Sequence, residues 1–135
     1  MADDLAAVTD THALVFHAAG GGRLGHKASA VFAAAERREA VIYVPAGVIW
    51  EVSLLARAVR INLHRPVREF FADLFSNPAY CPVDVSPDQV FDADELRFTR
   101  DPFDALIVAA ARSLGLPLIT RDTMIRESGA VRVIW

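Results

Sequence analysis

Residues 101–111, with the sequence DPFDALIVAAA, are the stretch from which the fold is best worked out. They begin with a helix-start pattern, in which Asp101 can cap the helix, Pro102 suits the first helical position and Asp104 falls at the third. A carboxylate at the third position meets unpaired N–H groups and the positive end of the helix dipole. A purely structural role is therefore one interpretation of Asp104.

The residues that follow favour a further role for Asp104. Ile107 and Val108 lie three and four positions later, so they share its face of the predicted helix, and both are apolar. An acid beside an apolar wall needs a proton, a cation or a hydrogen-bond donor as its partner. Which of these Asp104 has depends on the residues that the fold brings beside it.

The composition is that of a folded protein. The chain has 135 residues, of which 53% are hydrophobic, and we expect residues 1–135 to form one domain. Cys81 is the only cysteine in the sequence, which favours a reducing compartment. The first five residues are acidic where a signal peptide would be basic, and no apolar run approaches membrane-spanning length. We therefore expect a soluble, cytoplasmic protein.

The charges give a mixed indication about nucleic acid. A net charge of −3 argues against bulk electrostatic binding, although a local basic face would be hidden in that sum. Lys27 is the only lysine and all other basic side chains except histidine are arginines. This bias favours bidentate contacts to phosphate or carboxylate, or it reflects the composition of the genome.

Strand and helix patterns alternate along the chain. We expect strands at 5–8, 41–44, 81–85, 116–120 and 131–135, and helices at 13–18, 29–39, 46–59, 64–79, 88–95, 101–111 and 123–126. This alternation predicts an α/β protein with a parallel sheet and helices on both faces.

Four carboxylates are expected at one edge of this sheet. In an open parallel sheet, ligands bind beyond the carboxyl ends of the strands. Asp10 follows the first strand and Asp122 follows the fourth, while Glu51 and Asp104 are expected in the first turns of helices. Each aspartate can also be explained as a helix cap. Together, however, four negative charges within a few ångströms require protonation or a divalent metal ion.

Glu51 carries an additional signal of its own. Its helical neighbours Gly47, Val48, Leu54 and Leu55 are all apolar, so Glu51 lies within a hydrophobic face. Glutamate is rarely found there without a partner, which favours a functional or ion-paired role over a position at the rim of that face.

The donor chemistry selects one class of reaction. Hard carboxylate oxygens prefer Mg²⁺ or Mn²⁺ to zinc, and the sequence has no Cys/His set with zinc spacing. Mg²⁺ held by carboxylates favours phosphoryl transfer. No serine lies in a GxSxG context and no GxGxxG follows a strand, so acyl transfer and dinucleotide binding are not indicated.

With these features the sequence resembles the PIN-domain ribonucleases, particularly the small bacterial toxins of the VapC type. The resemblance rests on DTHAL at 10–14, VPAGVIWEV at 44–52, RDPFDALIVAA at 100–110 and LITRD at 118–122. It implies a three-layer α/β/α fold with a mostly parallel central sheet. It also implies that Asp10, Glu51, Asp104 and Asp122 are the catalytic residues and bind Mg²⁺ or Mn²⁺.

The same resemblance implies further roles and partners. Thr120 would lie near the four acids, and Asp101 would be a helix cap or an outer acid of the site. Such proteins commonly form homodimers and are inhibited by a small antitoxin, whose tail can place an arginine in the acidic pocket. Two features depart from the family pattern: Thr9 stands where an aliphatic residue is common, and the loop at 20–25 is longer than usual.

Several arginines flank the expected site. They are candidates for contacts to RNA phosphates, although a solvated helix face explains several of them equally well. The candidates are Arg57, Arg60, Arg65, Arg68, Arg97 and Arg100.

Two functions from different classes follow. The first is a metal-dependent endoribonuclease that hydrolyses RNA phosphodiester bonds, acting on single-stranded or looped RNA because its bases are reachable. The second is a catalytically silent PIN-like module that binds a protein or RNA. The complete set of four acids favours the nuclease. A phosphoaspartate receiver is disfavoured because Asp10 is followed by Thr11 and His12 rather than by a second acid.

Overall fold

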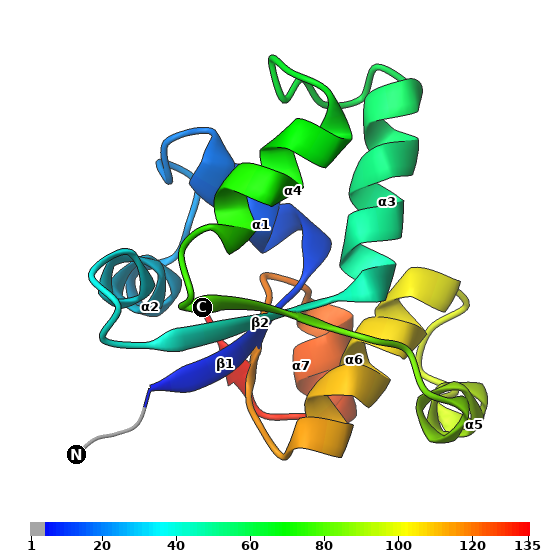
Figure 1. Cartoon of the computed structure of the whole chain (residues 1–135). Coiled ribbons are helices and arrows are strands. Elements are labelled where there is room, and N and C mark those ends of the chain that lie inside the picture. The colour runs from blue at the N-terminus through cyan, green and yellow to red at the C-terminus, as the bar shows by residue number, and fades with distance from the viewer. Residues whose placement is uncertain (1–4) are drawn as a thin grey trace.

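A five-stranded parallel sheet forms the centre of the protein (Figure 1). The structure is a computed structural model that describes residues 5–135, so most of the acidic start of the sequence lies outside the described residues. From one edge to the other, the strands are β3 (Tyr80–Val83), β2 (Val41–Pro45), β1 (Ala6–Thr9), β4 (Leu118–Ile119) and β5 (Val133–Ile134). The expected parallel sheet is confirmed.

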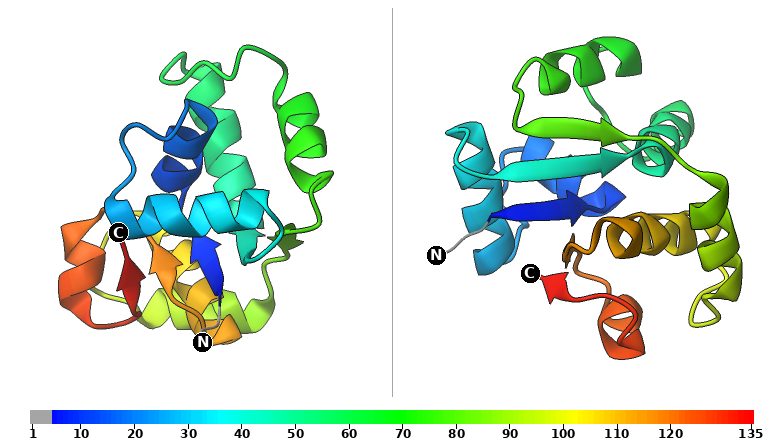
Figure 2. Two further views of the ribbon diagram at one scale, coloured as in Figure 1. Left: turned by 90° about the vertical axis from the view of Figure 1, so that its left-hand side faces the viewer. Right: turned by 60° about the horizontal axis from the view of Figure 1, so that its bottom comes forward.

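Helices connect the parallel strands and cover both faces of the sheet, because parallel neighbours need long crossovers. Figures 1 and 2 show α1 and α4 on one face and α6 and α7 on the other, which is the expected three-layer α/β/α arrangement. The helices are α1 (Thr11–Ala18), α2 (His26–Glu36), α3 (Ala46–Arg57), α4 (Val67–Phe75), α5 (Pro87–Glu95), α6 (Pro102–Leu114) and α7 (Thr123–Ser128).

The hydrophobic core lies between the sheet and these helices. The central strand β1 contributes Ala7 and Val8, and α6 contributes Ile107 and Val108, all at most 1% exposed. The burial of both α6 residues confirms that the helix that carries Asp104 has a buried face. Phe70 and Phe71 of α4 are also part of the core.

The largest difference from the predicted elements is in the helix expected at 64–79. It is shorter and forms α4, Val67–Phe75. The helix begins after Pro66, which lies at the N-cap. It ends before Asn77, whose side-chain oxygen accepts a hydrogen bond from the backbone N–H of Ala79 (2.9 Å) and turns the chain into β3. Local side-chain bonds of this kind compete with helical hydrogen bonding.

The other differences concern the ends of elements. Most ends are shifted by one to three residues: α2 begins at His26, α3 ends at Arg57, α6 continues to Leu114, and β4 and β5 are two-residue strands inside the expected segments. The extension of α6 stops at Gly115, whose φ of 66° lies in the left-handed region that glycine adopts easily. No helix within residues 5–135 is both long and apolar enough to cross a membrane.

Gly25, the N-cap of α2, is held tightly against the end of the chain. The backbone oxygen of Trp135 accepts a hydrogen bond from the N–H of Ala28 (2.9 Å), and a Cβ at position 25 would overlap that oxygen. We expect Gly25→Ala to cost about 1–3 kcal/mol and to lower the Tm by about 5–10 °C. Gly22→Ala is the matched control, because its Cβ would meet no atom within 4 Å. Equal Tm values for the two variants would contradict this packing account.

Candidate active site

Two carboxylates lie at the carboxyl ends of neighbouring strands. Asp10 follows β1, and its N–H donates to the Ile119 oxygen of β4 (3.1 Å). Asp122 follows shortly after the end of β4. Because β1 and β4 are adjacent and parallel, the fold brings both residues to the same edge of the sheet.

Both of these aspartates also cap a helix. Oδ1 of Asp10 accepts from the N–H of Ala13 (2.8 Å) at the start of α1. Oδ1 of Asp122 accepts from the N–H groups of Met124 (2.8 Å) and Ile125 (3.1 Å) at the start of α7. The capping interpretation and the site interpretation are therefore compatible. Each cap fixes the direction of a carboxylate through one oxygen atom and leaves its second oxygen available.

Glu51 and Asp104 reach the same place from helices. Asp104 is the third residue of α6, in the first turn as predicted, and its N–H donates to the capping Oδ1 of Asp101 (3.3 Å). Glu51 is the sixth residue of α3, so the prediction that it lies in the first turn was wrong. The helix starts directly after Pro45 and places Glu51 one turn further along. There its Oε1 accepts a hydrogen bond from the hydroxyl of Thr11.

The four predicted acids line a single pocket with a volume of about 310 Å³. Three further side chains complete the lining. They are one more acid, Asp101, and two basic residues, His12 and Arg121. The pocket thus collects five carboxylates.

The negative charge changes the acidity of two of these carboxyl groups. Burial, and then the charges of Asp101, Asp122, Glu51 and Asp10, raise the pKa of Asp104 to about 7. Burial also raises the pKa of Asp10, although the Thr120 hydroxyl, the Ala13 N–H and the charge of His12 oppose the rise. The negative charge of the pocket exceeds the positive charge of its own cations, so Asp104 keeps its proton to a higher pH than usual.

Thr120 connects two of the acids. It is fully buried, it hydrogen bonds to the Asp10 side chain, and its hydroxyl oxygen accepts from the N–H of Asp122 (3.1 Å). Thr9, which departs from the family pattern, is also fully buried, and its hydroxyl donates to the Asp10 carbonyl (2.9 Å). Both threonines thus support Asp10 and its strand end without contributing charge.

The four carboxylates line one pocket without converging on a single point. Within residues 5–135, no group of three or more His, Cys, Asp or Glu side chains has the geometry of a preformed metal site. The spacing follows from the electrostatics, since unneutralised carboxylates repel one another and the caps hold Asp10 and Asp122 in place. The types of donor nevertheless suit a hard divalent cation, because all of them are carboxylate oxygens.

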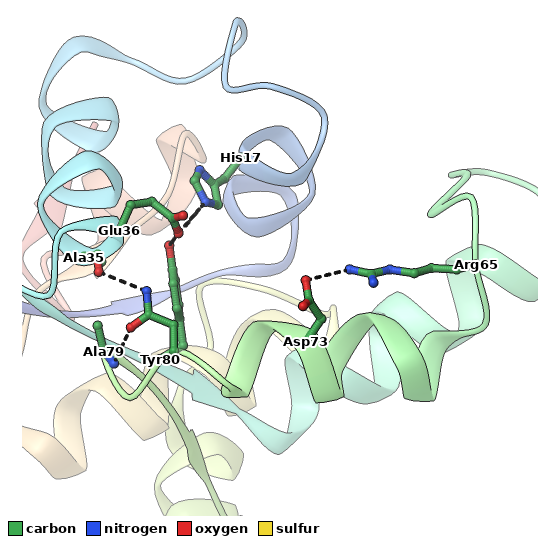
Figure 3. Close-up of polar contacts among 8 residues, drawn as sticks. His17, Ala35, Glu36, Arg65, Asp73, Ala79 and Tyr80 are labelled. Atoms are coloured by element: carbon green, nitrogen blue, oxygen red, sulfur yellow. Dashed lines mark hydrogen bonds and ion pairs between the residues drawn. The ribbon is translucent and has the colours of Figure 1, made fainter.

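A larger cavity, of about 510 Å³, lies elsewhere and is lined by parts of α1, α2 and α4. Its polar groups are already paired, as Figure 3 shows. The Tyr80 hydroxyl donates to Oε2 of Glu36 (2.6 Å), which lies 3.3 Å from Nε2 of His17. Arg65 donates to Asp73 (3.0 Å). Because the polar groups of this cavity are bonded to one another, we place the chemistry in the smaller pocket, where the carboxylates form no ion pair among the described residues.

The fold and this pocket belong to a known family. Residues 7–130 match the family model of the PIN domain. The chain belongs to the PIN-domain family. The resemblance drawn from the four sequence segments is thereby confirmed, and the matched range includes all four acids of the PIN-domain pocket.

Solved structures share this PIN-domain fold. VapBC2 from Rickettsia felis, bound to a DNA fragment from its promoter, is 14% identical with a TM-score of 0.68, covering 96% of this chain and 97% of that chain. A toxin–antitoxin complex from Klebsiella pneumoniae is 25% identical, with a TM-score of 0.59 and 87% coverage of both chains. FitAcB from Neisseria gonorrhoeae is 17% identical, with a TM-score of 0.61 and coverage of 93% and 94%. No curated protein sequence matches significantly.

The six arginines proposed as RNA contacts lie on the surface of the protein. All six are exposed, and none of them lines the acidic pocket of the PIN domain. Arg65 pairs with Asp73 beside the larger cavity, and Arg57 lies over the Trp50 ring with its Cζ 5.1 Å from the ring centroid.

Two residues of the pocket were missed. Arg121 and His12 line it, and neither was proposed as a site residue. Arg121 stands between Thr120 and Asp122, and His12 follows Asp10 by two positions. Their place beside acids at the carboxyl ends of two strands was a signal available in the sequence.

Proposed function

We propose that this PIN domain is a divalent-metal-dependent endoribonuclease and the toxin of a type II toxin–antitoxin pair. The observation that carries the proposal is the pocket itself, in which neighbouring carboxylates contribute to raising the pKa of Asp104 to about 7. Such an excess of partly buried negative charge favours the binding of a divalent cation. The toxin–antitoxin complexes among the structural neighbours support the second part.

The metal ligands and catalytic residues we propose are carboxylates from four separate segments: Asp10, Glu51, Asp104 and Asp122. They suit Mg²⁺ or Mn²⁺, because both ions prefer hard oxygen donors. An ion bound there supplies Lewis-acid activation of water and neutralises charge on the phosphate.

The chain's own residues prepare the site in three ways. The Thr11 hydroxyl holds Glu51 toward the pocket, and the Thr120 hydroxyl supports Asp10. The backbone N–H groups at the starts of α1 and α7 hold Asp10 and Asp122. Asp104 must lose its proton before it can act as a ligand, so the proposed activity rises with pH as this group ionises. Asp101 caps α6 and contributes charge from the outside of the site.

The partners we propose follow from the same pocket. Single-stranded or looped RNA is the proposed substrate, since its phosphates and bases are reachable outside a regular helix. A small antitoxin with a basic side chain would find unneutralised carboxylates to bind. We further propose that residues 1–135 form a single PIN domain and that the protein works as a homodimer in the cytoplasm.

The proposal is tested by incubating the purified protein with a mixed pool of single-stranded RNA in Mg²⁺, in Mn²⁺ or in EDTA. We expect internal cleavage with either metal ion and none in EDTA. Cleavage that persists in EDTA would contradict a metal-dependent mechanism. Comparing a single-stranded RNA with the corresponding duplex tests the substrate class, and the single strand is expected to be cut faster.

A further inference from the structure

Two arginines from distant parts of the sequence stack on one aromatic ring. Phe16 of α1 is 6% exposed, and Cζ of Arg23 lies 4.7 Å from the centroid of its ring. Cζ of Arg121 lies 5.0 Å from the same centroid. Trp135 packs against Phe16 edge to face, with 6.4 Å between the ring centroids. The ring is therefore held in place, and both guanidinium groups lie within about 5 Å of its centroid.

Neither guanidinium is neutralised within the described part of the chain. Arg37, Arg65 and Arg112 each form an ion pair with a carboxylate, whereas no carboxylate of residues 5–135 lies within 4 Å of the guanidinium groups of Arg23 or Arg121. Both residues are exposed to solvent. Each of these two guanidinium groups can therefore bind an anion from outside the chain. A phosphate suits the site, because its oxygens match the forked donors of guanidinium groups.

The glycine-rich loop at 20–25 explains how Arg23 reaches Phe16. Gly20 and Gly21 have φ values of 105° and 81°, which L side chains rarely adopt. The N–H of Gly21 donates to the Phe16 carbonyl (2.8 Å), so the loop turns back onto the end of α1. Figure 2 shows this loop on the same side of the molecule as the end of the chain and α7. The unusual length of the loop thus serves to carry a cation to this ring.

The arginine pair is continuous with the acidic pocket. Arg121 lines the pocket and also contacts Phe16. His12 lines the pocket one helical turn before Phe16, with 6.3 Å between the two ring centroids. Arg121 and His12 are exposed side chains beside the carboxylates, and the exposed Arg23 contacts the same buried Phe16 ring as Arg121.

We propose that Arg121 and Arg23 bind backbone phosphates of the RNA beside the bond that is cut, so that the strand runs from the carboxylate pocket past Arg121 toward the loop at 20–25. The inference rests on the proposed function and adds to it the direction of the substrate. It assigns phosphate binding to Arg23 and Arg121, which are not among the six arginines first expected to contact RNA. None of those six lines the pocket. Arg23 and Arg121 are positioning residues, because they would bind the strand at phosphates that do not take part in the reaction.

Binding is measured apart from catalysis. A short unstructured RNA labelled with a fluorophore is titrated with the full chain in Ca²⁺, and the anisotropy is recorded at several salt concentrations. The variants are Arg23→Gln, Arg121→Gln and the double variant. Arg132→Gln is the matched control, since Arg132 is exposed and precedes β5, at the amino ends of the strands, whereas the acids lie beyond their carboxyl ends. Thermal unfolding verifies that all variants have the Tm of the wild type.

Each single variant is expected to weaken binding about 5- to 10-fold and to lower the slope of log K against log salt by about 0.7, the value for one phosphate contact to a single strand. The double variant should lose both contacts. Arg23→Lys should restore the salt slope, since it restores the charge, and Arg132→Gln should bind as the wild type does. A merely structural role would change the Tm and leave the slope unchanged.

The outcomes separate this inference from the proposed function. If both single variants bind and cleave RNA like the wild type while Asp104→Asn is inactive, the proposed nuclease activity is supported. The proposed path of the strand along Arg121 and Arg23 is then wrong. If the variants lose binding as expected but the wild type cleaves no RNA in any metal ion, the path stands and the nuclease is wrong. A wild type that binds no RNA overturns the path. If Arg23→Gln and Arg121→Gln bind RNA no more weakly than the control Arg132→Gln, the inference is overturned as well.

Discussion

Asp104→Asn is expected to lower the rate of RNA cleavage by about 10³-fold or more, because removal of a metal ligand forfeits several kcal/mol of transition-state stabilisation. The substitution keeps the shape of the side chain, and the helix cap is provided by Asp101 rather than by Asp104. The fold should therefore be retained. The measurement is a single-turnover cleavage assay at saturating Mn²⁺, with circular dichroism to verify the helix content.

Asp101→Asn is the matched control for this variant. It removes a carboxylate from the same pocket, and asparagine also caps helices well. We expect less than a tenfold loss of rate, since Asp101 is proposed to act from outside the site. Equal losses for the two variants would contradict the distinction between a ligand and a capping residue. Full activity of Asp104→Asn would remove Asp104 from the mechanism.

Without metal, Asp104 should destabilise the folded protein as the pH rises. Its folded-state pKa of about 7 lies above its ordinary value of 3.8, so the folded state binds more protons than the unfolded state between these limits. The free energy of unfolding therefore falls from about pH 4 to about pH 7. At pH 8 we expect Asp104→Asn to be more stable than the wild type by about 1–2 kcal/mol, less than the full shift implies, because Asp104 is partly exposed to solvent.

Divalent metal should reverse this order of stability. At a metal concentration about 100 times the Kd, binding adds about 2.7 kcal/mol, which corresponds to a rise of about 10 °C in the Tm of the wild type. The rise should be much smaller at pH 5, where protons compete with the metal for Asp104, and much smaller in Asp104→Asn at any pH. Differential scanning fluorimetry of both proteins with EDTA or Mn²⁺ provides the comparison. A wild-type Tm that is equally raised at both pH values would contradict the assignment of the ligands.

Much of the fold was predictable because the relevant signals are local. The strand before Asp10 and the strand before Asp122 end in polar residues, and parallel strands bring such ends together. The helix start at Asp101 and Pro102 was recognisable in the same way, and the structure has the cap at Asp101 and Pro102 as the first residue of α6. The placement of four acids in one pocket followed from these signals and from the order of the segments.

The missed features depend on contacts between segments that are distant in sequence. The stacking of Arg23 and Arg121 on Phe16 requires the turn at Gly20 and Gly21 to fold back onto α1, and no periodic pattern encodes that return. Arg65 was a candidate contact to RNA, and the loop before α4 brings its guanidinium within 3.0 Å of Asp73. Its partner could be identified only once the start of α4 was known.

The alternative function is defined by what it predicts. A catalytically silent PIN-like module would keep the pocket for structural reasons, since Asp10 and Asp122 cap helices whether or not metal is bound. It would show no heat of metal binding, and at pH 8 Asp104→Asn would be more stable than the wild type both with and without metal.

Isothermal titration calorimetry of Mn²⁺ into the wild type and into Asp104→Asn, above pH 7 where Asp104 is ionised, tests the central claim most directly. The account predicts saturable binding by the wild type. It predicts binding at least about 100-fold weaker for the variant, since even outer-shell changes cost 10- to 100-fold in metal affinity. Absence of binding to the wild type, or equal binding by both proteins, would contradict the assignment of this pocket as a divalent-metal site.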